Sequence, residues 1–446
     1  MTLAGTKALV VGMKLSGMAS AELLAREGAV VRATDLKPLE ALPGARELLE
    51  RLRIPLALQT PEVFENCDLI VLSPDVPADL PPLQQARRRG AHVIGEVELA
   101  APFLKGATIG ITGSNGKTTT TSLIGHILLA AGLPAQVGGN IGKPVTAMLD
   151  TSRAEGWNVL ELSSFQLETI TTFRAHTALA LNVTQNHLDR HHTFENYAAA
   201  KARLFETQRA GDFAVLNAED PVCVSYAART AAAVEWFSGA RKVSPGASLS
   251  GENLVLDGEF LMPASEIPIR GRHNVENVLA ASIAAARAGV ARQAIAAAVR
   301  TFQAVEHRLE FVRQVGGIDF YNDSKATSVD ATLKALSAFA GGLWVILGGK
   351  DKGLDYAVLR EPLAARARAA LLIGAAAAKI ADQLRGAVPL VDSKTLDAAA
   401  AYAYEHALPG DTVLLAPACA SFDQFRSFEH RGQVFKQIVK RLEPKS

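Results

Sequence analysis

The stretch GITGSNGKTTT, residues 110–120, decides the fold of the middle of this chain. An apolar run leads into it, and a glycine-rich turn then leads to Lys117 and a row of threonines. Glycines allow backbone conformations closed to other residues, so successive N–H groups can point at phosphate oxygens. A lysine and a threonine at the start of the next helix supply a cation for the outer phosphates and a hydroxyl for Mg²⁺. The stretch therefore predicts a strand, a phosphate-binding loop and a helix.

The spacing of this loop differs from the common G-x-x-x-x-G-K motif. It is shorter when counted from Gly113 and longer when counted from Gly110. The loop alone leaves three uses of a nucleoside triphosphate open. They are transfer of the phosphoryl group, hydrolysis for motion or signalling, and activation of another molecule.

Strand and helix patterns alternate on both sides of the loop, which indicates parallel sheets. Apolar runs predict strands near residues 7–12, 30–35, 69–73, 91–95, 107–112, 158–162, 177–183, 213–217, 318–323, 344–349, 370–374, 388–392 and 412–416, and a short β-rich patch is expected at 253–269. A chain of 446 residues is also too long for one hydrophobic core. We predict an α/β protein with a Rossmann-like domain at residues 1–103, a P-loop ATPase-type α/β domain at 104–304 and a second Rossmann-like domain at 305–446.

The composition argues against several classes of protein. A formal net charge of +1 lacks the basic excess of a protein that coats nucleic acids. No apolar run approaches the length of a membrane helix, and the N-terminus MTLAGTKALVVG enters a strand without a leader pattern. The three cysteines are far apart, as expected for free thiols in a reducing compartment. We expect a cytoplasmic protein that binds neither nucleic acid nor membranes.

Charged side chains follow the next predicted strands. Glu161 ends the strand NVLEL at a sheet edge where ligand sites form, so its carboxylate could hold Mg²⁺; a helix-capping acid is the alternative. The segment NVTQNHLDRHH then brings together His187, His191 and His192. Zinc is disfavoured because no cysteine or HExxH accompanies them, which leaves His187 as the best single metal ligand. On chemistry alone, Lys201 in the next helix is a solvated surface lysine.

The order of these blocks resembles the ATP-dependent Mur ligases of peptidoglycan synthesis over the whole chain. The matching stretches are TGSNGKTTT, NVTQNHLDRH, the AAK that contains Lys201, GRHNVENVLAA (271–281), EHRLE (306–310) and DSKATS (323–328). The stretches GGNIG (138–142), ELSSFQLE (161–168), LGGKDKG (347–353) and PACASFDQFRSFEHRG (417–432) resemble the branch that joins D-glutamate to UDP-N-acetylmuramoyl-L-alanine. The resemblance implies that ATP converts the substrate carboxylate into an acyl phosphate, which the amine of D-glutamate attacks.

The resemblance also implies a role for each matching residue. ATP would contact Gly113, Ser114, Asn115, Gly116, Lys117, Thr118, Thr119, Asn274, Asn277, Arg308 and Asp323. Two Mg²⁺ ions would be held by Thr118, Glu161, His187 and Lys201, the last as a carbamate that provides anionic oxygen. The catalytic residues would be Lys117, Glu161, His187, Lys201, Arg308 and Lys325.

Two further sets belong to the substrates of a ligase that we expect to be a monomer. The UDP-linked substrate would contact Leu15, Ser16, Asp35, Lys37, Asn140, Ser163 and Gln166, and D-glutamate would contact Lys325, Thr327, Lys352, Ser421 and Phe428. Three residues depart from the pattern of the family. Lys14 and Asp75 stand where glycines are usual, which leaves the diphosphate contacts open, and Asn186 stands where an acid is usual.

Three alternatives remain. Another Mur-type ligase or a folylpolyglutamate synthase would share the chemistry, although the N-terminal domain and PACASFDQF argue against the folate enzyme. A P-loop GTPase or motor would carry a guanine-reading motif such as NKxD, which this sequence lacks. An inactive binding protein is disfavoured because the whole reaction set is intact.

Overall fold

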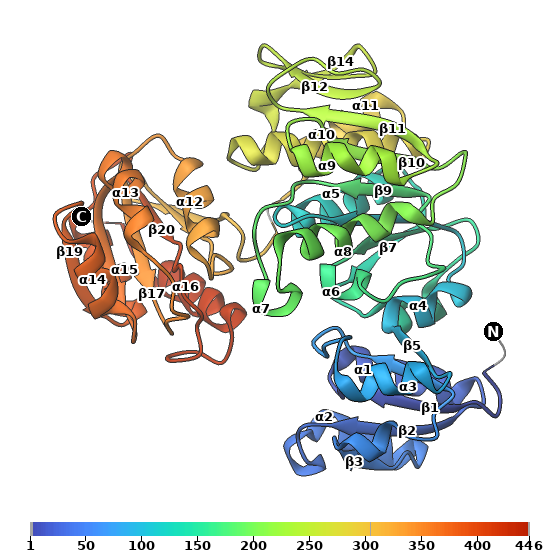
Figure 1. Ribbon diagram of the computed structural model, residues 1–446. Coiled ribbons are helices and arrows are strands. Elements are labelled where there is room, and N and C mark those ends of the chain that lie inside the picture. The colour runs from blue at the N-terminus through green and yellow to red at the C-terminus, as the bar shows by residue number, and fades with distance from the viewer. Residues whose placement is uncertain (1–2, 304, 445–446) are drawn as a thin grey trace. The chain divides into compact units, whose positions relative to one another are not determined.

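The computed structural model describes residues 3–303 and 305–444, which contain three β-sheets with helices packed on them (Figure 1). The predicted α/β class is confirmed. The described chain forms two compact units. The first runs to Glu266 and includes Glu276–Thr301, and the second consists of Ile267–Val275 and the chain from Phe302 onward. The chain therefore passes from one unit to the other inside a helix, α10 (Arg272–Arg287).

The N-terminal sheet is entirely parallel, in the order β3-β2-β1-β4-β5. Its strands are β1 (Lys7–Val11), β2 (Val30–Asp35), β3 (Leu56–Leu58), β4 (Leu69–Leu72) and β5 (His92–Gly95). The helices of this part are α1 (Leu15–Arg26), α2 (Pro43–Leu52), α3 (Pro81–Arg88) and α4 (Glu96–Ala100). The order reverses between β1 and β4, so the loops after these two strands meet at the point where α/β sheets bind ligands.

The central sheet has nine strands in the order β14-β13-β12-β11-β10-β9-β6-β8-β7. They are β6 (Ala107–Thr112), β7 (Ala135–Gly139), β8 (Trp157–Glu161), β9 (Thr177–Ala180), β10 (Phe213–Asn217), β11 (Ala233–Ser238), β12 (Gly246–Ser250), β13 (Asn253–Leu256) and β14 (Glu259–Pro263). The helices are α5 (Lys117–Ala130), α6 (Ser164–Leu167), α7 (Leu188–His191), α8 (Phe194–Glu206), α9 (Pro221–Ser225), α10 and α11 (Arg292–Thr301). Parallel pairing from β7 through β12 ends in an antiparallel hairpin, β13–β14.

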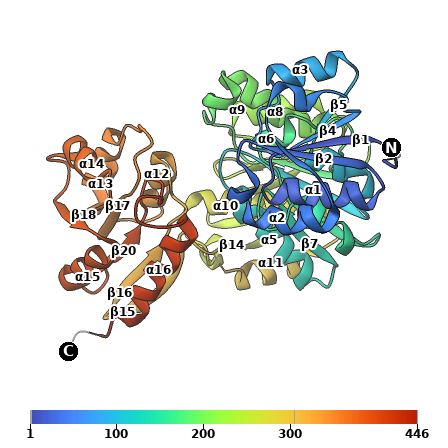
Figure 2. The same ribbon diagram turned by 90° about the horizontal axis from the view of Figure 1, so that it is seen from below.

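The C-terminal sheet has the order β15-β16-β20-β17-β18-β19, and only its edge pair β15–β16 is antiparallel. Its strands are β15 (Glu310–Val315), β16 (Ile318–Asn322), β17 (Leu343–Gly348), β18 (Ala367–Ile373), β19 (Leu390–Lys394) and β20 (Thr412–Leu415). The helices are α12 (Val329–Ser337), α13 (Arg360–Arg366), α14 (Ala377–Leu384), α15 (Leu396–His406) and α16 (Phe428–Arg441). Figure 2 shows α16 lying along the β15–β16 pair.

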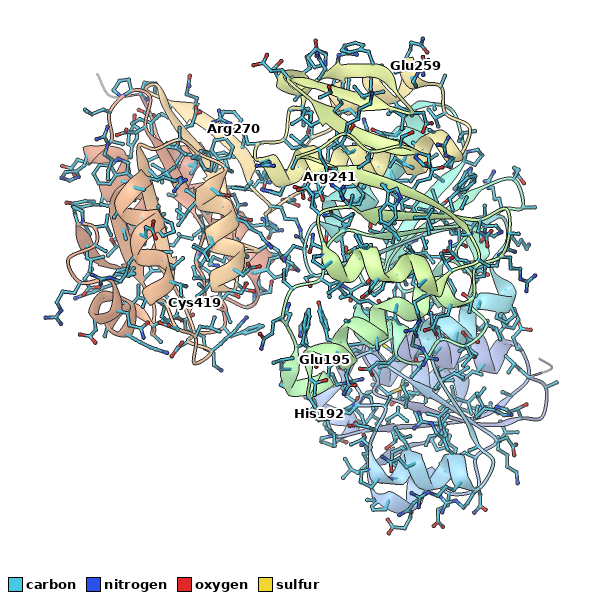
Figure 3. The ribbon with its side chains drawn as sticks, turned by 45° about the horizontal axis from the view of Figure 1, so that its top comes forward. His192, Glu195, Arg241, Glu259, Arg270 and Cys419 are labelled. Atoms are coloured by element: carbon cyan, nitrogen blue, oxygen red, sulfur yellow. The ribbon has the colours of Figure 1, made fainter. Side chains whose placement is uncertain are left out.

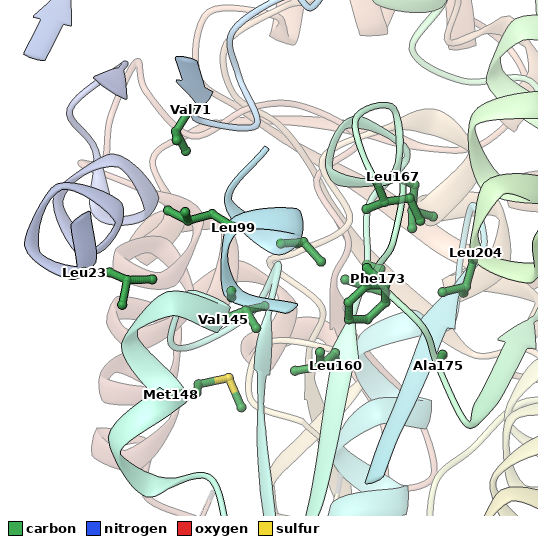
Figure 4. Close-up of a cluster of buried hydrophobic side chains, with 14 of the residues drawn as sticks. Leu23, Val71, Leu99, Val145, Met148, Leu160, Leu167, Phe173, Ala175 and Leu204 are labelled. Atoms are coloured by element: carbon green, nitrogen blue, oxygen red, sulfur yellow. The ribbon is translucent and has the colours of Figure 1, made fainter. Parts of the chain in front are cut away.

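One continuous apolar cluster extends from the N-terminal sheet into the central sheet of the first unit (Figure 4). Leu23 and Val71 contribute from the N-terminal part, and Leu160 and Leu204 contribute from the central part. Leu99 of α4 lies between them, because α4 contacts both β5 and the 3₁₀ segment Val145–Thr151. Among the described residues, no helix is both long and apolar enough to cross a membrane.

The predicted strands are present, and the sequence analysis missed β3, β7, β11, β12 and β15. β3 is only three residues long, and the other four lack a continuous apolar run, including the interior strands β11 and β12. β7 reads AQVGG, with two glycines, and β15 reads EFVRQV at the edge of its sheet. Solvent contact at an edge allows polar residues, which removes the signal of a fully buried strand.

Candidate functional site

The phosphate-binding loop joins β6 to α5 as the sequence predicts. Gly113 and Gly116 have φ angles of 151° and 84°, conformations that favour glycine. A Cβ on Gly116 would also lie less than 3.0 Å from Asn277 Oδ1, so the loop backbone lies close to α10. Asn115 N donates to Asn182 Oδ1 at 2.8 Å, and Asn182 Nδ2 donates back to Asn115 O at 3.2 Å. The loop is therefore held in shape by glycine conformation and by side chains from neighbouring elements.

Two lysines converge on one main-chain carbonyl of this loop. Lys117 Nζ lies 2.8 Å from Gly113 O and 3.1 Å from Ser114 O. Lys201 Nζ, from α8, lies 2.9 Å from the same Gly113 O. The predicted solvated position of Lys201 is wrong, since its side chain is 1% exposed. Two cationic groups this close repel each other, so the pair favours the presence of an anion or the loss of a proton.

The pKa of the Lys201 amine is far below its ordinary value. Burial is the main cause, and the nearby charge of Lys117 lowers this pKa further. The Nζ atom also lies 4.6 Å from the centre of the Tyr197 ring. A lowered pKa increases the share of uncharged amine, and the uncharged amine is the nucleophilic form.

Glu161 ends β8 beside this loop, and both of its oxygens accept hydrogen bonds. Thr118 Oγ1 donates to Oε2 at 2.7 Å, and Asn140 Nδ2 donates to Oε1 at 2.8 Å. The helix-capping alternative therefore does not describe this side chain. The carboxylate is buried and receives these two bonds from neutral groups. A hydroxyl and a carboxylate form a hard-oxygen donor set, so these residues fit a Mg²⁺ ion.

The three histidines of the NHLDRHH segment have separate surroundings. His187 is exposed, has a φ of 53° and packs edge-on against Phe165 with ring centres 4.9 Å apart. His191 is buried, with Nε2 3.0 Å from Ser164 Oγ, and burial lowers its pKa to about 4. His192 Nε2 lies 3.2 Å from Asp79 Oδ2. His187 and His192 are thus exposed to solvent and His191 is not.

A cavity of about 520 Å³ lies in the first unit between the β1–α1 loop, the loop after β4, and the loops after β7 and β8. Four predicted substrate residues line it, namely Leu15, Ser16, Asn140 and Gln166. Ser163 caps α6 in a reciprocal capping box with Gln166. These residues, far apart in sequence, therefore lie around one cavity.

Asp35 and Lys37 lie beside the β1–α1 loop, and the Asp35 carboxylate contacts its backbone. The Asp35 carboxylate accepts hydrogen bonds from Met13 N at 2.7 Å and from Lys37 N at 2.9 Å. Neither Asp35 nor Lys37 is among the residues that line the cavity. Asp35 therefore fixes the β1–α1 loop through its backbone, and this loop carries Leu15 and Ser16.

Lys14 and Asp75, the two departures at the N-terminal loops, face each other. Lys14 Nζ lies 2.5 Å from Asp75 Oδ2, both side chains are mostly exposed, and both residues line the cavity. Lys14 is the N-cap of α1, so its ammonium stands beside the positive end of a twelve-residue helix. The negative charge of Asp75 is thus balanced by the positive charge of Lys14 at the same cavity.

In the second unit, four of the five predicted D-glutamate residues contact one another in pairs. Lys325 Nζ lies 3.9 Å from the centre of the Phe428 ring, and Lys352 Nζ donates to Thr327 O at 3.0 Å. Burial lowers the pKa of Lys352. Ser421 is buried, and its carbonyl accepts hydrogen bonds from Gln424 N and Phe425 N, so it shapes the loop before α16.

Asp323 and Arg308 lie on the β16 side of the same unit. Asp323 Oδ1 accepts a hydrogen bond from Leu309 N at 3.3 Å. Burial raises the pKa of Asp323 to about 7, while that backbone bond and the charge of Arg308 act in the opposite direction. Asn274 belongs to the segment that packs with this unit, and Asn277 belongs to the other unit.

Arg431 is a buried cation that the sequence analysis did not single out. It is 0% exposed, and its guanidinium donates to Ser324 Oγ at 2.9 Å, Ser324 O at 2.9 Å and Cys419 O at 3.2 Å. Burial lowers its pKa to about 10. Its position in the stretch SFEHRG is the only sequence feature that could have indicated a special role. An arginine in a helix is usually exposed, so its burial was not predictable. Through these hydrogen bonds Arg431 connects the loop that contains Ser421 to the segment DSKATS (323–328).

A second acidic cluster, Glu306, His307 and Glu310, has the spacing of a metal site. However, Lys436 Nζ lies 2.8 Å from Glu306 Oε1 and 2.5 Å from Glu310 Oε1. The ammonium already pairs with both carboxylates and offsets part of their charge. The cluster therefore ties α16 to the start of β15.

A parallel sheet with a strand, a glycine loop and a helix that starts with lysine and threonine defines an α/β protein with a phosphate-binding loop. The chain belongs to the Mur ligase family. Residues 6–95 match the Mur ligase MurD-like N-terminal domain, residues 111–285 the Mur ligase middle domain, and residues 307–419 the Mur ligase glutamate ligase domain. The resemblance found in the sequence is confirmed at the level of the family.

Several curated relatives match over nearly the whole chain. The UDP-N-acetylmuramoylalanine–D-glutamate ligase of Solibacter usitatus is 77% identical, over 100% of both chains. The protein of the same name from Acidobacterium capsulatum is 53% identical, over 98% of this chain and 97% of the relative.

Solved structures share the fold. The UDP-N-acetylmuramate-alanine ligase of Thermotoga maritima has a TM-score of 0.60 at 18% identity, over 98% of this chain and 99% of that one. A pseudomurein peptide ligase from Methanothermus fervidus has a TM-score of 0.59 at 18% identity, with the same coverage.

Proposed function

We propose that this protein is an ATP-dependent ligase that adds D-glutamate to UDP-N-acetylmuramoyl-L-alanine in the cytoplasm, during synthesis of peptidoglycan precursors. The 77% identity over the full length to a ligase of that name carries the proposal. The oxygen-lined site beside the phosphate-binding loop and the lysines of the second unit support it. We propose that the protein acts as a monomer.

The proposed reaction has two steps. A carboxylate oxygen of the L-alanyl group attacks the γ-phosphorus of ATP, and ADP leaves. The amine of D-glutamate then attacks the acyl carbon through a tetrahedral intermediate, and phosphate leaves as the amide forms. Catalysis of such a transfer rests mainly on positioning and on charge stabilisation.

Residues of the first unit would hold the triphosphate in this scheme. Backbone N–H groups of Gly113 to Gly116 and the start of α5 would bind phosphate oxygens, with Thr119 in the first turn. Lys117 would exchange its bonds to the loop carbonyls for bonds to the outer phosphates. Asn274 and Asn277 would contact the nucleoside, and Arg308 and Asp323 would complete the ATP contacts.

We propose that two Mg²⁺ ions act with Thr118, Glu161, His187 and Lys201. The ions would spread the charge of the γ-phosphate when bound. The hydroxyl–carboxylate pair of Thr118 and Glu161 suits one such ion. Lys201 would act as a carbamate, because an uncharged buried amine is the form that combines with carbon dioxide.

The substrates would occupy the sites described above. Leu15, Ser16, Asn140, Ser163 and Gln166 would receive the UDP-linked substrate, with Asp35 and Lys37 acting on its uridine side. Lys325 and Lys352 would pair with the two carboxylates of D-glutamate, which suits a dianion. Thr327, Ser421 and Phe428 would complete that pocket.

We also propose the three-domain organisation predicted from the sequence, with boundaries at residues 1–103, 104–304 and 305–446. The three family matches each fall inside one of these ranges, which supports the proposal. The assignment of Ile267–Val275 to the second unit places a short central segment with the C-terminal part.

An acceptor assay tests the proposed function. The protein is incubated with ATP, Mg²⁺ and UDP-N-acetylmuramoyl-L-alanine, together with D-glutamate, L-glutamate, L-alanine or L-lysine. We expect phosphate release and a new amide with D-glutamate only. Equal release with all four amino acids would refute the assignment. Hydrolysis of the triphosphate without any acceptor would instead favour a GTPase-like or motor-like protein.

A further inference from the structure

Arg190, in α7, holds the main chain of one wall of the 520 Å³ cavity. Its Nη2 donates to Val76 O at 2.8 Å, and its Nη1 donates to Asp75 O at 3.3 Å. Asp75 lines the cavity and pairs with Lys14 across its edge. A guanidinium on two consecutive carbonyls fixes the backbone direction of this loop, which a bond to a mobile side chain would not do.

The other side of the same guanidinium is held by Glu168, which does not itself line the cavity. Arg190 Nη2 lies 2.7 Å from Glu168 Oε2, and Nε lies 3.3 Å from Glu168 Oε1. Glu168 directly follows α6, whose Gln166 lines the cavity. The Arg190 and Glu168 side chains are 10% and 16% exposed, and the guanidinium packs 4.9 Å from the centre of the Phe165 ring. The ion pair between Arg190 and Glu168 is therefore largely shielded from water. Its two hydrogen bonds fix the relative orientation of the two side chains.

The two histidines that follow Arg190 also contact this part of the structure. His191 Nδ1 lies 3.3 Å from Glu168 Oε1, and the low pKa of His191 keeps it neutral near pH 7. His192, labelled in Figure 3, binds Asp79 from the same N-terminal segment. The α7 segment is therefore attached to the segment 75–79 at two points, with Arg190 as the buried one.

We propose that Arg190 is a positioning residue for the UDP-linked substrate, because it fixes the β4 loop relative to the end of α6. This inference rests on the proposed function. Without Arg190 the β4 loop and the end of α6 would lose their common partner, and substrate binding would have to order the β4 loop. Arg190 touches no reacting group, so its loss should weaken the binding of one substrate selectively.

Arg190→Ala, Arg190→Lys and Glu168→Gln test the proposal in the full-length protein. Arg174→Ala is the matched control, since Arg174 forms a bidentate pair with Asp212 in the same unit and neither residue hydrogen-bonds to a residue that lines the cavity. We expect Arg190→Ala to raise the KM for UDP-N-acetylmuramoyl-L-alanine about tenfold or more, as for loss of charged hydrogen bonds. The KM for ATP should change less than about threefold. Glu168→Gln should show a smaller effect of the same kind, and Arg190→Lys an intermediate one.

Calorimetric titration of the same substrate without ATP provides a second measurement, and Kd should rise in parallel with KM. Equal changes in the KM for ATP and for the UDP-linked substrate would overturn the proposal, as would a Kd unchanged from wild type. An effect no larger than that of Arg174→Ala would overturn it as well. If Arg190→Ala does not fold, Glu168→Gln decides by the same criterion. Inactive wild-type protein in the acceptor assay would instead refute the proposed function.

Discussion

At the scale of single residues, the most informative groups are those whose surroundings contradict their ordinary behaviour. Lys201 is a lysine in a helix, yet it is buried and shares a carbonyl with Lys117. Its role came only from the family resemblance, because a period of 3.6 residues predicts a face without predicting what lies opposite it. The roles of Arg190 and Arg431 were not predicted for the same reason. Glu161 was predictable, since a carboxylate at the end of a buried parallel strand lies at a known type of ligand site.

Lys201→Ala tests the carbamate. We expect activity to fall at least about a hundredfold, since a buried group at the phosphate loop is removed, and to return in part with added short carboxylates such as acetate. Lys117→Ala is the control and should show no rescue, because an anion cannot replace its cation. Phosphate release measures both variants. Undiminished activity in Lys201→Ala would contradict the carbamate, and so would a complete lack of rescue.

At the scale of elements, strands rich in apolar residues were predictable, including β5 and β19 at sheet edges, and strands with many polar residues or glycines were not. Strands β1 and β4 are nearly continuous apolar runs, because neighbours cover both faces, and β6 and β8 are mostly apolar. Edge and hairpin strands in contact with solvent carry polar residues or glycine, so their sequences resemble loops. The β6–loop–α5 unit was predictable to the residue, since its glycines, lysine and threonine each meet a geometric requirement. The partners across the loop, Asn182 and Asn277, come from distant segments that local patterns do not connect.

Gly116→Ala tests the requirement at the loop. The positive φ angle costs about 1 kcal/mol for alanine, and the added Cβ would also collide with Asn277 Oδ1. Gly132→Ala is the control, with a φ of 77° just after the same helix and no atom within 4 Å of its Cβ. Both variants should lose comparable backbone stability in urea unfolding, but only Gly116→Ala should weaken ATP binding, by about tenfold or more. Equal ATP affinity in both would show that the close approach to Asn277 is unimportant.

At the scale of the whole molecule, the resemblance gave the order of the domains, while side chains in α4 explain how the two sheets of the first unit are joined. Glu96 accepts hydrogen bonds from Thr146 N at 2.6 Å and Thr146 Oγ1 at 3.0 Å. Glu98 accepts bonds from Thr171, Thr172 and Phe173. No pattern in EVELA indicates that these acids are buried, because their partners are 50 to 75 positions away.

These two acids predict opposite responses of stability to pH. Burial raises the pKa of Glu96 to about 7, so the folded protein keeps a proton that the unfolded chain loses near 4.5. Stability from this group is therefore complete below about pH 4.5 and is lost as the pH rises to 7, by about 3 kcal/mol for a shift of this size. Glu96→Gln should flatten the fall in the free energy of unfolding between pH 5 and 8, measured with urea.

Glu98→Gln is the matched variant. Burial alone would raise the pKa of Glu98, but hydrogen bonds from Thr171 and Thr172 outweigh it and lower this pKa. Its contribution is present above the unfolded value of 4.5 and is lost as the pH falls below it. Glu98→Gln should therefore lower the free energy of unfolding at pH 7. This loss should change little as the pH rises further. The same pH dependence in both variants would contradict the assignment.

The Lys14–Asp75 ion pair at the cavity has a consequence for the order in which its two residues could have replaced glycine. An acid arriving first would repel a diphosphate with nothing to balance it, whereas a lysine arriving first would add attraction at a helix start. An exposed pair contributes at most about 1 kcal/mol to folding, so selection on stability would hardly retain it. The pair would then serve ligand binding, and Asp75→Gly alone should weaken substrate binding less than Lys14→Gly alone.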